Sequence, residues 1–247
     1  MTVASPWDAV AHAHDVVGST NDEAKALARA GAPHGTVVSA RAQSAGRGRI
    51  GRSWASPPGN LYCSVVLRPT VAFARVAELG FVAALAVGDV VEARIARGTV
   101  SLKWPNDVLV DGAKVAGILL ECEAADGSAP WVVAGIGLNV ATAPSGLPYP
   151  VASLRAQGAS IDAPAALDDL LDALRSRLDE WEGDGFARVR VAWLERALRR
   201  DGPIRVRSGE RELIGRLADL DADGALIVQT AAGRERVVAG DVTPAGG

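Results

Sequence analysis

Residues 36–67 read TVVSARAQSAGRGRIGRSWASPPGNLYCSVVL, and the pattern of this stretch determines how the rest of the chain is interpreted. Its two ends, 36–40 and 61–67, are β-branched or apolar runs bounded by glycine and proline, which predicts two strands. Between them, Gly46–Arg52 holds three arginines and three glycines in seven positions. Arginine offers a planar fork of donors for carboxylate or phosphate, and glycine lets backbone N–H groups approach the same oxygens. The stretch therefore predicts an anion-binding loop between two strands.

The flanking sequence predicts an alternation of helices and strands. Thr20 and Glu23 make a capping box and Gly31 is a stop signal, so a helix is expected between them. Apolar residues recur at helical spacing from Phe73 to Ile95, and amphipathic patterns predict two later helices. These later helices cover 167–181 and 186–198, and further strands are predicted at 99–104, 108–110, 115–122 and 131–140. From Pro203 onward, short alternating runs at 204–206, 213–220, 225–229 and 237–242 predict a small β-barrel. We expect one domain over 1–200 and a second over 201–247.

Composition narrows the class of protein. The chain has 247 residues, 49% of them hydrophobic, and a formal net charge of −3. The first seven residues lack a basic start, and the apolar run Leu79–Gly88 is too short to cross a bilayer, so we expect a cytoplasmic protein without a membrane partner. Cys63 and Cys122 lie in strand-like runs and are expected to be buried thiols. Only three of the 26 basic residues are lysines, Lys25, Lys103 and Lys114, which marks them as places that favour a compact ammonium group.

The glycine–arginine segment also fits other anion-binding motifs, which its context argues against. Gly46, Gly48 and Gly51 satisfy the dinucleotide-binding expression, but residues 52–59 cannot open a helix and no acidic residue follows at the required distance. A Walker loop is excluded because no Gly-Lys-Ser/Thr follows. RNA-binding Arg-Gly repeats are a closer rival, but a short segment in an acidic chain with 4% aromatic residues offers neither a basic face nor stacking platforms.

Four motifs in order carry a resemblance to a known family. They are Gly46–Trp54 (GRGRIGRSW), Lys103–Asp107 (KWPND), Lys114–Glu121 (KVAGILLE) and Gly135–Asn139 (GIGLN). Together they resemble the motif set of biotin protein ligase over nearly the whole chain. The resemblance implies an α+β fold of the class II synthetase and biotin–lipoate ligase type, in which helices flank a mixed sheet, with a small C-terminal SH3-like barrel. It also implies that biotin and MgATP form biotinyl-5′-AMP, from which biotin passes to a lysine of a carboxyl carrier domain.

The resemblance assigns roles to particular residues. Bringing a carboxylate onto the α-phosphate sets two anions against each other, so fixed cations are required. The implied catalytic residues are Lys114, Arg49 and Asp107. The implied biotin contacts are Ser19, Thr20, Asn21, Gln43, Gly46, Arg47, Gly48, Arg49, Lys114, Gly117, Gly135 and Gly137. The implied ATP contacts are Arg49, Arg52, Trp54, Lys103, Asn106, Lys114 and Asn139, with Mg²⁺ assigned to Asp107.

Each assignment has a structural alternative. Lys114 follows an Asp-Gly turn, where a lysine is usually solvated. Asp107 is either a turn residue or a carboxylate for Mg²⁺ or for the incoming amine. Ser19 and Thr20 act as helix caps whether or not they contact a ligand. Glycines within strands mark a bulge or a place where a ligand ring approaches.

Two other functions remain open. Lipoate ligase shares the fold and the adenylate chemistry, and a non-catalytic carrier-binding or nucleic-acid module is the alternative outside enzymes. About 18 residues precede Ser19-Thr20-Asn21, which fall where the family has biotin contacts. This is too few for a winged helix-turn-helix, so no DNA partner is expected.

Overall fold

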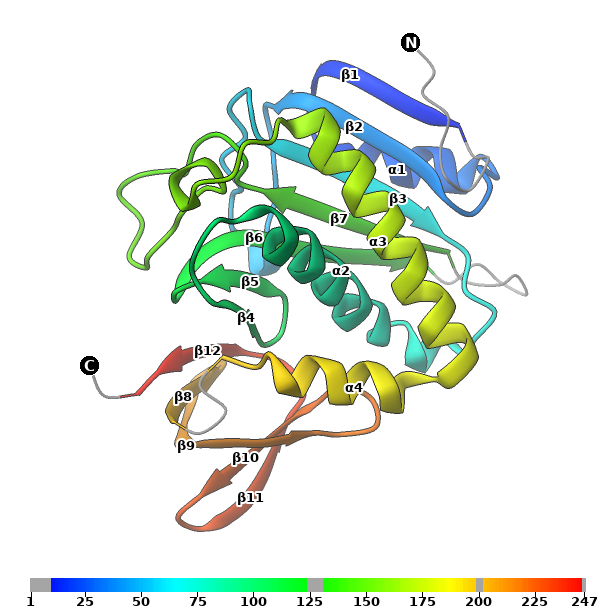
Figure 1. The fold of residues 1–247 in the computed structure, drawn as a ribbon. Coiled ribbons are helices and arrows are strands. Elements are labelled where there is room, and N and C mark those ends of the chain that lie inside the picture. Colours follow the sequence, from blue (N-terminus) through cyan, green and yellow to red (C-terminus); the bar gives the residue numbers. More distant parts are fainter. Residues whose placement is uncertain (1–9, 124–130, 199–201, 246–247) are drawn as a thin grey trace.

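The computed structural model describes residues 10–123, 131–198 and 202–245, and its elements follow one another as in Figure 1. The helices are α1 (Thr20–Arg29), α2 (Glu78–Arg94), α3 (Ala163–Asp184) and α4 (Phe186–Glu195), with 3₁₀ turns at Arg49–Gly51, Phe73–Arg75 and Arg155–Gln157. The first seven strands are β1 (Ala11–Val17), β2 (Thr36–Gln43), β3 (Leu61–Leu67), β4 (Val100–Lys103), β5 (Asp107–Val110), β6 (Ala113–Glu123) and β7 (Trp131–Leu138). The last five are β8 (Pro203–Ser208), β9 (Arg211–Leu220), β10 (Leu226–Thr230), β11 (Gly233–Val237) and β12 (Asp241–Pro244).

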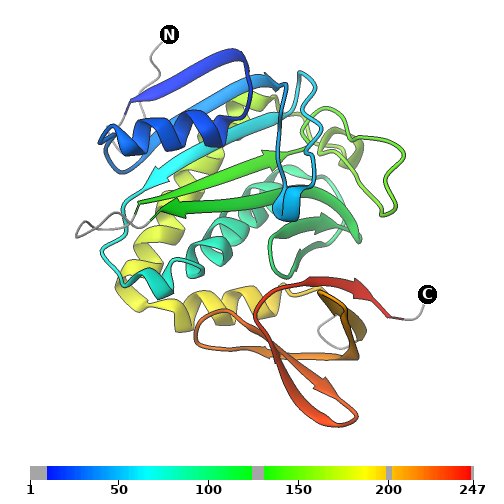
Figure 2. The same ribbon diagram turned by 180° about the vertical axis from the view of Figure 1, so that it is seen from behind.

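The larger sheet has the strand order β1-β2-β3-β7-β6-β5-β4. Strands β1 and β2 pair in parallel and every other neighbouring pair is antiparallel, so the sheet is mixed. Helices α2 and α3 cover one face of it (Figure 1), and α1 lies on the opposite face against β2, β3 and β7 (Figure 2). The expected mixed sheet flanked by helices is confirmed. On the face of the sheet that carries α1, this helix leaves parts of strands β5, β6 and β7 uncovered. The segment between β2 and β3 covers these parts instead.

Two apolar cores hold these layers together. The main core lies between the sheet and α2 and α3, and its fully buried side chains include Leu85, Leu138 and Leu174. A smaller core lies beneath α1, where Ala24 and Ala28 pack on the β2, β3 and β7 strands. Small residues on this face of α1 let the helix approach the sheet closely, which sets the position of its N-terminal residues.

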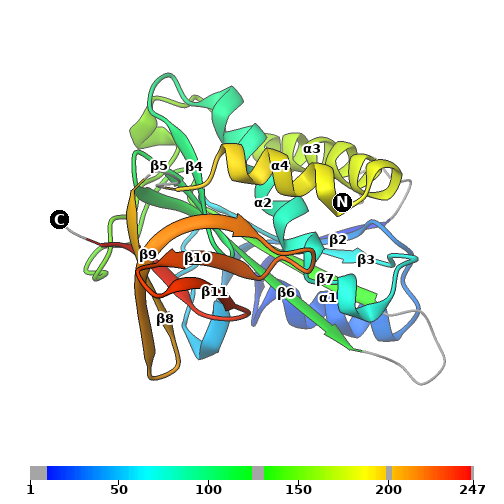
Figure 3. The same cartoon turned by 90° about the horizontal axis from the view of Figure 1, so that it is seen from below.

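The C-terminal strands form a separate antiparallel sheet of order β11-β10-β9-β8-β12, which curves beneath α4 (Figure 3). Its β9–β10 turn docks on the larger unit, since the Trp104 indole N–H donates to the Gly224 carbonyl at 3.1 Å. A Cβ at Gly224 would lie 2.4 Å from the Phe81 ring, so the turn is in close contact with α2. The small all-β unit expected at the C-terminus is therefore present and anchored. The expected boundary between residues 200 and 201 lies outside the described residues.

Several predicted elements differ from the structure. β1 was not predicted, because it is an edge strand whose residues are exposed or only half-buried and which pairs in parallel with β2. The N-cap of α1 is Ser19 rather than Thr20, and its side chain makes no capping hydrogen bond. The predicted strand 237–242 is two strands with a turn between them. Of the helices in the described residues, none has the length and apolar character required to cross a bilayer.

Candidate active site

The floor of the site is a row of residues that lie opposite one another across five strands. The pairings Tyr62 with Gly137, Gly137 with Gly117, Gly117 with Asp107, and Asp107 with Lys103 run from β3 to β4. Residues directly opposite in antiparallel strands point to the same face, so all five belong to the face that α2 and α3 do not cover. Two adjacent glycines in the middle of the row leave the backbone bare, which creates a flat surface.

The Trp54 indole lies on this flat surface. A Cβ at Gly137 would sit 2.5 Å from the Trp54 ring, and one at Gly117 would sit 3.1 Å from it. The sequence predicted a ligand ring against these glycines, whereas in the structure the Trp54 ring of the protein itself lies on Gly117 and Gly137. The Trp54 Nε1 is buried and has no hydrogen-bond partner. A buried donor without a partner is costly, so this position favours a ligand that supplies an acceptor.

A β-bulge brings Lys114 to the same face as the glycines. Along a regular strand, Lys114 and Gly117 would point to opposite faces because side chains alternate. The register of β5 with β6 shifts between Val108, which lies opposite Ala116, and Leu109, which lies opposite Lys114. One extra residue of β6 therefore stands between Lys114 and Ala116, and it reverses the alternation of side chains. The Lys114 Nζ consequently lies 5.2 Å from the centroid of the Trp54 ring, over its face.

Asp107 joins two of the three lysines. Its Oδ1 lies 2.6 Å from the Lys114 Nζ and its Oδ2 lies 2.9 Å from the Lys103 Nζ. Asp107 is 7% exposed. Burial raises the pKa of this carboxyl, but Lys114 and Lys103 outweigh the burial and hold the pKa below its ordinary value. Asp107 is therefore ionised, and it fixes two ammonium groups beside the glycine floor.

The 46–54 segment, which we call the arginine loop, is a short hairpin over the floor. Arg47 and Ser53 form an antiparallel bridge, and the Gly48 N–H donates to the Arg52 carbonyl at 2.7 Å. Ile50 at the tip has φ 55°, a left-handed conformation that is strained for a β-branched residue.

Each loop arginine reaches a different part of the molecule. Arg47 contacts Asp22 of α1, Arg49 donates to the Asn106 Oδ1 at 3.4 Å, and Arg52 pairs with Asp241 of β12. The 3.4 Å contact of Arg49 is the weakest of the three. The loop is therefore tied to the larger sheet, to α1 and to the C-terminal unit.

The other end of the site is polar and buried around the start of α1. The Thr20 N–H donates to the Gln43 Oε1 at 2.8 Å, and the Gln43 Nε2 donates to the Ser56 Oγ at 2.9 Å. The Asn21 amide lies on Gly135, where a Cβ would be 2.0 Å from its Oδ1. Thr20, Asn21 and Gln43 offer hydroxyl and amide groups at this end, which suit a neutral polar group of a ligand.

Most of the predicted site residues line one pocket. Its lining consists of Ser19, Thr20, Asn21, Gln43, Arg47, Gly48, Arg49, Arg52, Ser53, Trp54, Asn106, Asp107, Lys114, Gly117, Ile118, Leu119, Gly135, Ile136, Gly137, Tyr149 and Asp241. Three predicted residues stand apart from it. Lys103 touches the pocket only through Asp107, and Gly46 lies at the base of the loop, bonded to the Trp54 N–H. The Asn139 side chain is buried and donates to the Ala152 carbonyl at 3.1 Å.

Sequence reasoning missed Tyr149 and Asp241. Neither belongs to a motif, and both come from segments far from the arginine loop in the chain. A lone tyrosine in a loop and a lone aspartate after a turn carry no pattern that indicates a site. All three apolar lining residues lie inside the predicted motifs, but only Leu119 shares the face of Gly117 and could have been named from strand alternation. Ile118 and Ile136 alternate to the opposite face and belong to the main core.

A resident Mg²⁺ does not fit the donor set. Both oxygens of Asp107 face lysine ammonium groups, and a hard dication prefers oxygen ligands without competing cations. Among the described residues, no group of three or more His, Cys, Asp or Glu side chains is placed to hold a metal. The assignment of Mg²⁺ to Asp107 stays a prediction.

Comparison with known proteins gives a consistent answer. Residues 14–139 match the biotin/lipoate A/B protein ligase family, and residues 202–243 match the biotin protein ligase C-terminal domain. The biotin–[acetyl-CoA-carboxylase] ligase of Paracoccus denitrificans is 41% identical over 235 residues, which cover 91% of this chain and 96% of the relative. The bifunctional ligase/repressor BirA of Bacillus subtilis is 33% identical over 235 residues, which cover 93% and 72%.

A solved structure shares the fold over almost the full length. The biotin protein ligase of Aquifex aeolicus, in complex with biotin and ATP, has a TM-score of 0.80 and 27% identity, and the match covers 94% of this chain and 97% of that one. The fold and the site define an adenylate-forming type of architecture with an anion-binding loop over a glycine floor. The chain belongs to the biotin protein ligase family.

Proposed function

We propose that this protein activates biotin with ATP to biotinyl-5′-AMP and transfers the biotin to a lysine of a carboxyl carrier domain. The observation that carries the proposal is the pocket itself, where Lys114, Arg49 and Arg52 face a glycine floor capped by Trp54. A neutral polar end and a cationic end in one pocket match a molecule with a urea-like ring at one end and a carboxylate at the other.

For the first step, the cations offset the repulsion between the biotin carboxylate and the α-phosphate. Lys114 is held by Asp107 at 2.6 Å, so its ammonium is positioned before the substrates arrive. Preorganised charge of this kind stabilises a transition state without reorganisation at the moment of reaction. Arg49 and Arg52 line the same pocket and supply donors for phosphate oxygens.

For the second step, the carrier amine attacks the carbonyl carbon of the mixed anhydride, the bond from that carbon to the phosphate oxygen breaks so that AMP leaves, and the proton lost by the nitrogen passes to water. The lowered pKa of Asp107 makes it a weak base, so we assign it to fixing the lysines rather than to accepting the amine proton. The arginine loop keeps water from the labile anhydride until the carrier binds. In this proposal Mg²⁺ enters with ATP as part of the substrate.

The remaining parts of the proposal concern location and partners. A cytosolic location agrees with Cys63 and Cys122 being free thiols. We propose no DNA partner, because the arginines that the sequence concentrates in one loop are turned toward Asp22, Asn106 and Asp241 rather than outward as a basic face. A gel-shift assay at low salt tests this part, and retarded DNA would contradict it.

The direct test is pyrophosphate release from the purified protein with biotin and MgATP. We expect release in the presence of biotin, an adenylate that co-elutes with the protein, and label on an added carrier domain. Lipoate in place of biotin is the control. Release with lipoate alone would indicate the lipoate ligase alternative, and no release with either acid would indicate a non-catalytic carrier-binding module.

A further inference from the structure

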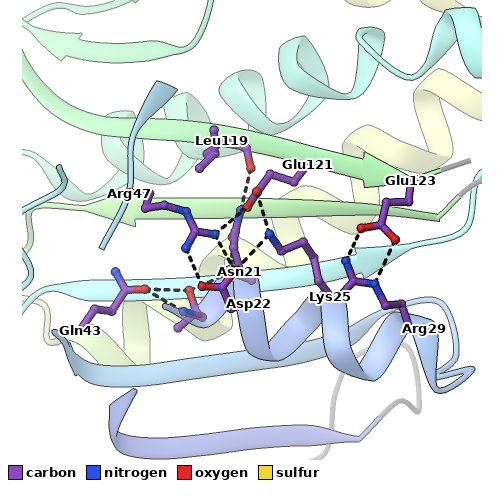
Figure 4. Close-up of polar contacts among 11 residues, drawn as sticks. Asn21, Asp22, Lys25, Arg29, Gln43, Arg47, Leu119, Glu121 and Glu123 are labelled. Carbon is purple, nitrogen blue, oxygen red and sulfur yellow. Dashed lines mark hydrogen bonds and ion pairs between the residues drawn. The ribbon is translucent and has the colours of Figure 1, made fainter. Parts of the chain in front are cut away.

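Four charged side chains meet at the α1 side of the pocket, and Figure 4 shows how they face one another. Arg47 of the arginine loop contacts both Asp22 oxygens, at 2.5 and 2.7 Å, and its Nη2 lies 3.3 Å from a Glu121 oxygen. Lys25 lies 3.0 Å from Asp22 and 2.8 Å from Glu121. Each cation therefore touches both carboxylates, and the cluster is neutral as a whole.

The loop supplies one of the two cations. Asp22 and Lys25 belong to α1 and Glu121 belongs to β6, so these three stand on regular elements that do not depend on the loop. Without Arg47, two carboxylates would share Lys25 alone, which leaves one negative charge uncompensated. Arg47 restores neutrality when the loop is closed. Because its guanidinium contacts both oxygens of Asp22, the pair also fixes the orientation of the Arg47 side chain.

The cluster is connected to the floor of the pocket. The Asn21 Nδ2 donates to Glu121 at 2.7 Å, and the Asn21 Oδ1 accepts from the Ser64 Oγ at 2.6 Å. Asn21 also covers Gly135. The Glu121 carboxylate, one of the two that contact Arg47, is thus oriented by Asn21, which itself lines the ligand pocket.

We propose that Asp22 and Glu121 are positioning residues that latch the arginine loop through Arg47, and so set how long a ligand stays beneath it. The proposal rests on the proposed function, in which that ligand is biotin and then biotinyl-5′-AMP. Arg47 acts as the loop's latch, because both of its terminal nitrogens are committed to carboxylates of the protein. The hydrogen bond from Arg47 lowers the pKa of Asp22 to about 2, so the latch is charged at every physiological pH.

The structure contains a matched control pair. Arg29 and Glu123 join the same helix to the same strand, with the Arg29 Nε donating to Glu123 at 2.9 Å (Figure 4). This pair includes no loop residue. Glu23 provides a second control, because it is exposed in the first turn of α1 beside Asp22 and shares any effect of helix N-terminal charge.

Limited trypsin digestion measures loop opening without any ligand, because Arg47, Arg49 and Arg52 are themselves cleavage sites. Asp22→Asn should speed cleavage within 47–52, located by mass spectrometry, about threefold to tenfold, since a partly exposed bidentate pair is lost. Glu121→Gln should have a smaller effect in the same direction. Glu123→Gln and Glu23→Gln should leave this cleavage rate unchanged.

A double-mutant cycle tests whether Asp22 acts through Arg47. In an Arg47→Gln background, Asp22→Asn should add almost nothing to the cleavage rate. An undiminished effect of Asp22→Asn in that background, or an unchanged rate in Asp22→Asn alone, would overturn the latch.

A ligand readout separates the latch from the proposed function. With radiolabelled biotin, Asp22→Asn should release biotinyl-5′-AMP faster by a factor similar to the digestion result. Its rate of adenylate formation at saturating substrates should change less than about twofold, a split that general unfolding would not produce. If the unsubstituted protein forms no adenylate, the proposed function fails, and the trypsin assay still decides the latch.

Discussion

Two charge clusters flank the pocket, and they are built in opposite ways. In the inner cluster, Asp107 bridges Lys103 and Lys114, and all three come from neighbouring strands of one sheet. In the outer cluster, Asp22 and Glu121 meet Lys25 and the loop residue Arg47. The Asp107 side chain is 10% exposed, whereas the Asp22 side chain is 49% exposed.

The difference separates two tasks. Ions fixed by strand register and excluded from water are suited to chemistry, because their positions do not depend on a ligand and their interactions are strong. Ions that are partly solvated and completed only by a loop form weaker, screened contacts that can break and re-form. The molecule thus keeps the groups that act on the substrate apart from the groups that hold it.

Removal of Lys114 should produce the largest effect and is the strongest challenge to the assignment of the inner cluster. Lys114→Ala removes one charge that offsets the carboxylate–phosphate repulsion, so we expect adenylate formation to fall by about 10²–10³-fold. Pyrophosphate release measures this step. Normal release in a folded variant would show that the inner cluster is structural.

A methyl group on the floor should have the next largest effect. Gly137→Ala would place a Cβ 2.5 Å from the Trp54 ring, and we expect a loss of about 1–3 kcal/mol in biotin binding from the overpacking. Gly117→Ala should cost less, because its contacts are at 3.1 Å or more and include the flexible end of Lys114. Titration calorimetry measures both, and Gly183→Ala, which meets nothing within 4 Å, is the control.

A change at the tip of the arginine loop should have a smaller effect. It sharpens the contrast between the inner cluster, which the sheet holds rigid, and the outer cluster, which the loop completes. Ile50 is exposed and holds a positive φ, which costs roughly 1–2 kcal/mol for a side chain of this type. Ile50→Gly relieves this strain in the closed loop but increases the freedom of the open loop. The net stabilisation of the closed loop is the relieved strain minus the cost of the added freedom. We therefore expect biotin to dissociate up to about fivefold more slowly. Faster dissociation would indicate that the tip is not strained.

The smallest effect expected is that of pH near neutrality. The pKa of Asp22 falls from 3.8 to about 2, mainly through its hydrogen bond to Arg47, so its contribution is present above pH 3.8 and is lost as pH falls through about 2. The pKa of Lys25 is raised from 10.5, because Glu121 and Asp22 outweigh the opposing burial, so its contribution persists below that value. The biotin dissociation rate should therefore be constant from pH 5.5 to 9 within about twofold. A step within this window would mean that another group controls the loop.

The elements with strong local patterns could be predicted from the sequence. The predicted strand at 61–67 has the same bounds as β3, and the loop between two strands is where it was expected. β1 was not predicted because its residues are exposed or only half-buried, and its pairing with β2 joins segments that no local pattern connects. Such an edge strand has no period of its own in the sequence.

The site was predictable as a set of motifs but not as an arrangement. The sequence brought Lys114 and Gly117 together by resemblance, whereas the physical reason is a bulge that strand periodicity cannot reveal. The pairing of Arg47 with Asp22 and Glu121 links three distant segments, and no local rule connects them. The three lysines that the composition singled out all lie in the two clusters.

The pairing of Arg52 with Asp241 has a practical consequence for anyone handling this protein. Asp241 opens the last strand, so an affinity tag or fluorescent reporter fused at the carboxyl end would be carried beside one anchor of the arginine loop. β1 lies at the outer edge of the larger sheet, remote from that anchor in strand order. A tag for purification or imaging is therefore better placed ahead of β1.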